Sequence, residues 1–279
     1  MMRFLTLTAI LGVLNLPGTL PAAQAQEPVN ASVTEDVYTA DLQLPGGASA
    51  KLTVTFEDVV GLSPLSLGVS AVQVNPLDPA LLQRLGKAVG GVPAAFPMLV
   101  RIEPDPAHGL SFSGTVLVEL YTHDLEFAAG SPLRLFSAPD GGAFRDITVL
   151  NHAGSYRSGG TKGNFSEFII AIDTRPPTDA AADKLQYLRT LLDGHAPSMD
   201  VAVYDELSSL LAGVETAFAA TSLVTAITRI EAFADAVTNH SGSIPSVWSA
   251  TQNLENVAGE LRAAAGTLRF SLALATNSS

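Results

Sequence analysis

Apolar and polar residues alternate through most of the first 175 positions of this chain. The alternating runs are separated by turn clusters rich in Pro, Gly and Asp. A period of two is that of a strand with one buried face, and several short strands of this kind are typical of two packed sheets. The runs are Leu52–Phe56, Leu65–Ala71, Met98–Ile102, Val116–Leu120 and Leu133–Leu135. Residues 26–175 are therefore predicted to form an antiparallel β-sandwich, interrupted by a short helix at Asp78–Leu85 and a loop at Gly86–Pro93.

The spacing of apolar residues changes to three and four after Thr174–Thr178, which is the spacing of amphipathic helices. The predicted helical runs are Leu185–Leu192, Met199–Phe218, Leu223–Val237 and Leu254–Leu268. Thr178 and Ser198 are candidate N-caps. Four such helices with short connections most simply close into an antiparallel bundle over residues 176–279. The predicted fold class is thus α+β, with an N-terminal antiparallel β-sandwich followed by a four-helix antiparallel bundle. Pro176-Pro177 forms a stiff junction, so we expect the two domains to be packed.

The first 25 residues have the pattern of a signal peptide. Arg3 precedes the apolar run Phe4–Leu16, and Ala23-Gln24-Ala25 is an A-x-A cleavage site. A transmembrane anchor is the alternative, but the run is shorter than the roughly 20 residues that a membrane span needs. We therefore expect an exported protein, periplasmic or extracellular, that begins at Gln26 and does not insert in the membrane after cleavage.

Composition narrows the function classes. The chain has no cysteine and a formal net charge of −12. Disulfides, thiol nucleophiles and cysteine-ligated metals are excluded, and an acidic surface repels nucleic acid. No cofactor is predicted. The expected partner is another envelope or extracellular protein.

Residues 110–172 resemble a β-sandwich module known from ankyrin and zona-occludens proteins. The matching segments are Leu110–Gly114, Val116–Leu120, Leu133–Phe136, Phe144–Ile147 and Phe165–Phe168. The chain has Phe144 where that module often has Trp. Residues 178–272 resemble the small helical modules of FIMAH type, and the whole chain resembles an exported bacterial family of uncharacterised function. The first resemblance implies a structural or interaction domain without catalysis.

The glycine-rich segment Gly154–Gly163 holds the best candidate binding residues. A glycine-rich segment with a lysine is typical of a phosphate-binding loop. A P-loop, however, needs Gly-Lys-Ser/Thr at the start of a helix, whereas Thr161-Lys162 precedes a predicted strand. We interpret the segment as a hairpin loop. Basic and aromatic residues are scarce in this acidic chain, so Tyr156, Arg157 and Lys162 are predicted to contact a ligand or partner.

No motif identifies a reaction or a metal. The five histidines lack the close spacing of His-x-His or HExxH metal motifs. His123 and Asp124 lie at a strand end with Glu126, where a Zn or Ca site is an open alternative to an exposed polar loop. A convergent triad of Ser158 or Ser166 with His152 and Asp146 stays open, because such triads have no fixed spacing. Trp248 is interpreted as a core residue. No catalytic residue and no metal ligand are assigned.

The leading hypothesis is an exported, non-catalytic binding or scaffolding protein of the bacterial cell envelope or extracellular space. The alternative is a hydrolase that acts on an envelope or extracellular polymer through carboxylates or a convergent triad. A third possibility is an assembly factor whose partner adds to an open sheet edge.

Overall fold

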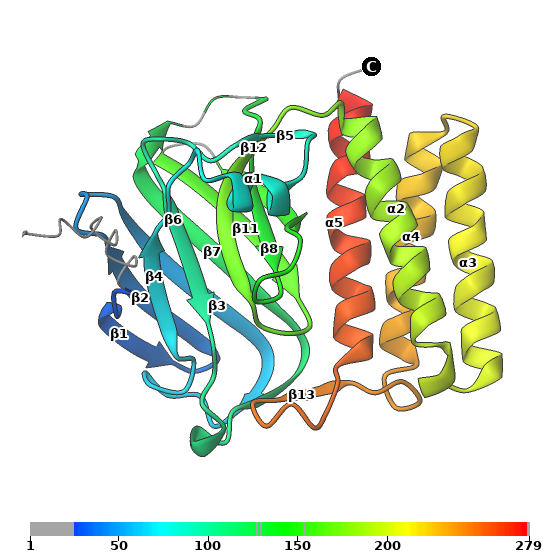
Figure 1. The fold of residues 1–279 in the computed structure, drawn as a ribbon. Helices are drawn as coiled ribbons and strands as arrows, with labels where there is room; N and C mark the ends of the chain where they lie inside the picture. The colour runs from blue at the N-terminus through cyan, green and yellow to red at the C-terminus, as the bar shows by residue number, and fades with distance from the viewer. Residues whose placement is uncertain (1–24, 127, 129, 153–154, 278–279) are drawn as a thin grey trace, which may run out of the picture.

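The computed structural model describes residues 25–126, 128, 130–152 and 155–277. It is a mixed α+β protein with two antiparallel sheets and, within these residues, five α-helices (Figure 1). The predicted signal peptide lies outside the described residues except for Ala25. None of the helices in the described part is long and apolar enough to cross a membrane.

The larger sheet has seven strands in the order β1-β2-β3-β7-β11-β10, with β13 paired to β7. The strands are β1 (Val29–Thr34), β2 (Val37–Gln43), β3 (Ser49–Val60), β7 (Ser111–Glu126), β10 (Thr148–His152), β11 (Ser155–Lys162) and β13 (Val247–Ser249). Strands β3 and β7 alternate between buried and less buried positions over most of their length, which is the pattern of a sheet with one face in a core.

The smaller sheet has six strands in the order β4-β6-β12-β8-β9, with β5 paired to β12. The strands are β4 (Val69–Gln73), β5 (Val89–Gly91), β6 (Met98–Ile102), β8 (Leu133–Ala138), β9 (Arg145–Asp146) and β12 (Glu167–Asp173). Strand β12 is buried at almost every position because it lies inside the sheet and is covered on both faces. Helix α1 (Pro79–Leu85) covers the outer face and begins with an Asp78 cap that accepts a hydrogen bond from the Ala80 amide.

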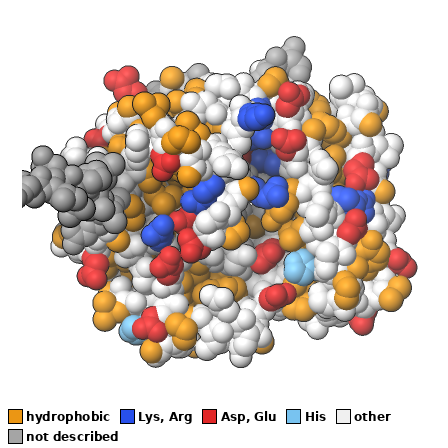
Figure 2. Space-filling model, in the orientation of Figure 1, with side chains coloured by type: hydrophobic (Ala, Val, Ile, Leu, Met, Phe, Trp, Pro, Cys, Tyr) orange, Lys and Arg blue, Asp and Glu red, His pale blue; other side chains and the backbone are white. Residues whose placement is uncertain are grey.

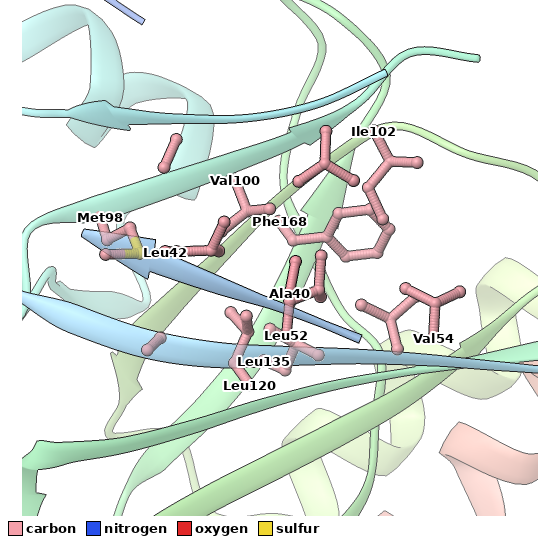
Figure 3. Close-up of a cluster of buried hydrophobic side chains, with 14 of the residues drawn as sticks. Ala40, Leu42, Leu52, Val54, Met98, Val100, Ile102, Leu120, Leu135 and Phe168 are labelled. Carbon is pink, nitrogen blue, oxygen red and sulfur yellow. The ribbon is translucent and has the colours of Figure 1, made fainter. Parts of the chain in front are cut away.

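The two sheets face each other across one apolar core. Figure 3 shows Leu52 of β3 and Leu120 of β7 near Val100 of β6 and Phe168 of β12. All four side chains are fully buried. This shared core fixes the relative position of the sheets.

Four helices form a second apolar cluster beside the sheets (Figure 1). They are α2 (Pro177–Gly194), α3 (Val201–Ala219), α4 (Leu223–Asn239) and α5 (Val257–Asn277). Helix α5 contacts α2 and α4 on one side and strands β7, β10 and β11 on the other. It therefore joins the helical cluster to the larger sheet.

Short-range contacts hold the helical part on the strand part. Asn256 Nδ2 donates to the Gly114 carbonyl at 2.6 Å, and Arg262 pairs with Glu57 at 2.6 Å. A Cβ atom on Gly163 would stand 2.4 Å from the Glu260 backbone nitrogen, so glycine is required for the close approach of α5. The helical part is thus packed on the strands, as the stiff junction predicts.

Several sequence expectations need correction. Gly154–Gly163 is not a hairpin loop, since β11 begins at Ser155 and pairs with both β7 and β10. Leu65 is 72 % exposed and precedes β4, so the run Leu65–Ala71 is a strand only in its second half. The loop at Gly86–Pro93 contains β5, which pairs with β12.

The helix ends also differ from the expected ones. Helix α2 starts at Pro177 rather than after a Thr178 cap, because proline fits the first helical position. Helix α3 follows Asp200, and Ser198 donates instead to the His195 carbonyl.

Trp248 is partly buried and belongs to β13 rather than to the end of a helical bundle. Its ring lies 5.4 Å from that of Phe112 and 5.2 Å from that of Phe165. A segment from the helical half of the sequence therefore completes a strand-based core. The change of pattern at Thr174–Thr178 does not separate all strands from all helices.

Candidate functional site

A cleft of about 820 Å³ lies where the helices meet the strands. One wall is formed by the segment after α1 and by the region from β8 to β9. Helices α2 and α5 form the opposite wall, and the turn from β11 to β12 closes the space between them. A cavity of this size can enclose most of a small organic molecule.

The cleft lining is basic although the chain is acidic. It includes Lys87, Arg145, Lys162, Arg175 and Lys184, against the carboxylates of Asp146, Asp183 and Glu260. Figure 2 shows Lys and Arg side chains gathered in the hollow between the strand half and the helices. Five of the few cations in a chain of net charge −12 thus converge on one site.

Two of these cations are neutralised within the protein. Lys184 Nζ lies 2.7 Å from Asp146 Oδ2 and 3.2 Å from the Thr267 carbonyl oxygen that accepts its hydrogen bond. Burial raises the pKa of the Asp146 carboxyl. The Lys184 ammonium and the hydrogen bonds from Thr148 together lower it by more than burial raises it, so the net shift is downward. This pair joins β9 to α2 and is structural.

Arg175 is likewise engaged. Its guanidinium donates to Asp173 at 2.6 Å and to Asp183 at 2.7 Å. These hydrogen bonds, above all those to Asp173, raise the pKa of Arg175. Arg175 therefore closes the junction between β12 and α2 and has little charge to offer a ligand.

Lys162 and Arg145 remain without an ion-pair partner among the described residues. Lys162 is the last residue of β11 and shares a strand face with the buried Tyr156, so its side chain leaves the sheet on the core side. Burial lowers the pKa of Lys162 to about 8, and Glu260 offsets this only in part. Its ammonium group is still mostly protonated at pH 7.

Arg145 is held by an aromatic ring. The centre of its guanidinium lies 4.3 Å from the centroid of the Tyr187 ring. Stacking of this kind fixes the plane of the guanidinium and leaves its N–H groups free to bind an anion. Burial raises the pKa of Tyr187, so this ring stays neutral.

Glu260 is the remaining carboxylate. Its Oε1 accepts a hydrogen bond of 2.8 Å from Asn164 Nδ2, and its Oε2 lies 4.0 Å from His195 Nε2. The Oδ1 atom of Asn164 is buried and accepts no hydrogen bond from the part of the chain that the structure describes. Glu260 therefore anchors the β11–β12 turn to α5 and balances one of the cations in the cleft.

The structure separates the three binding residues predicted from the sequence. Tyr156 is fully buried in the core between the sheets, with its hydroxyl 3.4 Å from Asn151 Oδ1. Arg157 is exposed on the opposite face of β11, beside the Tyr121 ring at 5.2 Å. Lys162 alone lines the cleft. Adjacent positions on a strand point to opposite faces, so Tyr156 and Arg157 are not brought together.

The open triad is not assembled in the structure. Ser158 Oγ is buried and has no hydrogen-bond partner among the described residues. Ser166 Oγ lies 2.6 Å from Ser137 Oγ, and Asp146 is paired with Lys184. Asp124, a candidate ligand in the sequence, accepts a hydrogen bond of 2.7 Å from the Ser49 amide. Within the described residues there is no group of three His, Asp or Glu side chains that could hold a metal ion.

Sequence reasoning missed Arg145, Tyr187, Lys184 and Glu260. They lie on β9, α2 and α5, far apart in the chain, and no local motif connects them. Arg145 was visible only as part of a strand segment, and the α2 and α5 residues only as polar positions of amphipathic helices.

A family profile matches most of this chain. No curated protein and no solved structure matches the chain. The profile of this family covers residues 13–276, which include both sheets, every wall of the cleft and the four helices of the second cluster up to Thr276 of α5. The chain therefore belongs to the family of unknown function DUF6689.

Proposed function

We propose that this chain is an exported, non-catalytic binding protein of the bacterial cell envelope or extracellular space, and that the cleft is its binding site. One observation carries the proposal. In a chain of net charge −12, a concave site of about 820 Å³ contains two cations, Lys162 and Arg145, that have no ion-pair partner in the described part of the chain. Lys162 is partly buried, and an unpaired charge in such a position is costly to stability, whereas Arg145 is exposed and available to a ligand. Ionisable groups of the first kind are typical of binding sites.

Export is supported by the sequence pattern of residues 1–25. The proposed locations are the periplasm and the medium. Scaffold contacts with other envelope proteins belong to the same proposal and would use surfaces outside the cleft.

We also propose a finer description of the fold. The two facing sheets are interpreted as a β-sandwich related to the module of ankyrin and zona-occludens proteins, and α2–α5 as an antiparallel four-helix bundle. The shared core of the sheets and the separate apolar cluster of the helices support this division. Strand β13 crosses it, because it belongs to the helical half of the sequence.

A hydrolase remains the second candidate, favoured by one observation. The pKa of Lys162, lowered by burial to about 8, suits a general base. However, Lys162 makes no hydrogen bond to a serine, threonine or carboxylate among the described residues. A base without a nucleophile or an oriented partner favours binding over catalysis.

The test is a ligand screen with a blocked cleft. Ala143 is exposed and lines the cleft, so Ala143→Trp fills its mouth without disturbing the core. Ala202 on α3 is also exposed but lies outside the cleft, and Ala202→Trp is the matched control. Residues 26–279 and both variants are screened by thermal unfolding against acidic, neutral and basic small molecules.

We expect ligands at a hundredfold excess over Kd to raise the Tm of the wild type and of Ala202→Trp by about 5–10 °C. The Ala143→Trp variant should show no shift. A screen in which no compound depends on an open cleft would contradict the proposal. Chemical conversion of a bound compound, followed by NMR, would instead support the hydrolase.

A further inference from the structure

Resting on the proposed function, we infer that the ligand is a small organic acid. Its carboxylate or phosphate group lies between Lys162 and Arg145, and its apolar portion lies along Tyr187, Ala263 and Ala264. All five residues line the same cleft. They come from β11, β9, α2 and α5, so the site exists only when the helices are packed on the strands.

The charge balance of the cleft favours an anion. Lys184 neutralises Asp146, while Arg175 is shared by Asp173 and Asp183, which leaves one negative charge of that group uncompensated. Among the described lining residues, Glu260 is the other carboxylate, and these two negative charges face the three cations Lys87, Arg145 and Lys162. Glu260 is itself engaged with Asn164. The remaining charge is therefore positive, and a neutral or cationic ligand would leave it uncompensated.

Arg145 and Lys162 offer two different kinds of hydrogen-bond donor, and an acid group can accept from both. Arg145 presents a planar fork fixed by the Tyr187 ring at 4.3 Å, and this geometry matches two oxygens of a carboxylate or phosphate. Lys162 supplies a compact ammonium group with three donors and no hydrogen-bond acceptor among the described residues. A ligand acid group would complete both.

The size and the walls of the cleft indicate more than a bare inorganic ion. A volume of about 820 Å³ far exceeds that of one acid group. The ring of Tyr187 on α2 is half-buried, and it lines the cleft next to the cations together with the buried Ala263 and Ala264 of α5, so this part of the wall is apolar. The ligand class is therefore an acid with an apolar body.

The charged ammonium group of Lys162 destabilises the free protein, because no described carboxylate forms an ion pair with it. Burial lowers its pKa to about 8, and the attraction of Glu260 offsets this effect only in part. A bound acid group would supply the missing charge. This behaviour distinguishes Lys162 from Lys184, which already has a carboxylate partner at 2.7 Å.

The test compares acids with their neutral counterparts by titration calorimetry. Carboxylates such as benzoate are paired with their amides, and phosphate monoesters such as phenyl phosphate with their alcohols. The proteins are the wild type, Lys162→Met, Lys162→Arg and the control Lys51→Met, which removes an exposed lysine on β3 outside the cleft. The tighter of the two acid series identifies carboxylate or phosphate as the natural group.

We expect at least one acid to bind about tenfold or more tightly than its neutral counterpart, because a charged hydrogen bond contributes that much. Lys162→Met should lose this preference, Lys162→Arg should recover part of it, and Lys51→Met should keep it. Neutral compounds that bind as tightly as acids, with affinity lost in Ala143→Trp but not in Lys162→Met, would overturn the inference and leave the proposed function standing. If Ala143→Trp changes the binding of no compound, the proposed function fails as well.

Discussion

The ammonium group of Lys162 stands in the cleft with a pKa lowered by burial to about 8, and we expect Lys162→Met to stabilise the free protein at pH 7. The folded protein binds the Lys162 proton less tightly than the unfolded chain does. The resulting loss of unfolding free energy is complete below pH 8. It disappears as the pH rises toward about 10.5, the pKa of lysine in the unfolded chain. The gain should reach about 1–2 kcal/mol at pH 7, since the side chain keeps some exposure to solvent.

Urea unfolding of the wild type and of Lys162→Met at several pH values measures this gain. The difference between the two proteins should shrink between pH 8 and pH 10. A variant that is less stable than the wild type at pH 7 would show that Lys162 has a structural partner instead.

Removing one charge of the Asp146–Lys184 pair should destabilise the protein, in contrast to Lys162→Met, because the two groups lie 2.7 Å apart and both are buried. Asp146→Ala leaves a buried ammonium unpaired and should lower the free energy of unfolding by about 3–5 kcal/mol. The double variant Asp146→Leu/Lys184→Met should recover most of this loss. Glu57→Ala, which breaks the more exposed pair with Arg262, should cost about 1 kcal/mol or less.

The sequence can indicate single candidate residues but not the residues that surround them in the fold. Lys162 could be selected because basic residues are scarce in an acidic chain. The partners that give Lys162 its setting, Glu260 and Arg145, come from distant segments, and composition does not reveal which segments meet. Tyr156 was selected by the same argument, but the two-residue period of β11 directs it into the core.

At the scale of elements, α5 meets the β11–β12 turn through Gly163, where a Cβ atom would stand 2.4 Å from the Glu260 nitrogen. We expect Gly163→Ala to displace α5 and to cost about 1–3 kcal/mol, the usual penalty of overpacking. A Cβ atom on Gly194 would extend into open space, so Gly194→Ala is the matched control and should be neutral or mildly stabilising.

Chemical denaturation followed by circular dichroism compares the two glycine variants. Equal stability of Gly163→Ala and Gly194→Ala would mean that α5 does not approach the turn as closely as the structure shows.

The elements themselves were largely predictable. Period-two runs correspond to β3, β6, β7 and β8, and helical runs correspond to α1–α5, because one-sided burial leaves a direct trace in the sequence. The exceptions have physical causes. Strand β11 is rich in small and polar residues and was interpreted as a loop, and β5 and β13 have only three residues each.

The whole molecule should unfold as one unit. Trp248 is the only tryptophan of the chain, and it lies in a strand from the helical half that packs on Phe112 and Phe165 of the strand half. Its fluorescence therefore reports on the junction, whereas the far-ultraviolet circular dichroism signal is dominated by the helices. We expect the two unfolding curves to coincide. An earlier fluorescence transition would show that the junction opens before the helices melt.

The most direct test of the cleft as an acid-binding site is an NMR titration of the Lys162 ammonium group, with and without the acid that binds best. We predict a pKa of about 8 in the free protein and a rise of about one unit or more when the acid is bound, because a nearby anion favours the charged form. An ordinary lysine pKa of about 10.5 that no acid changes would contradict the account.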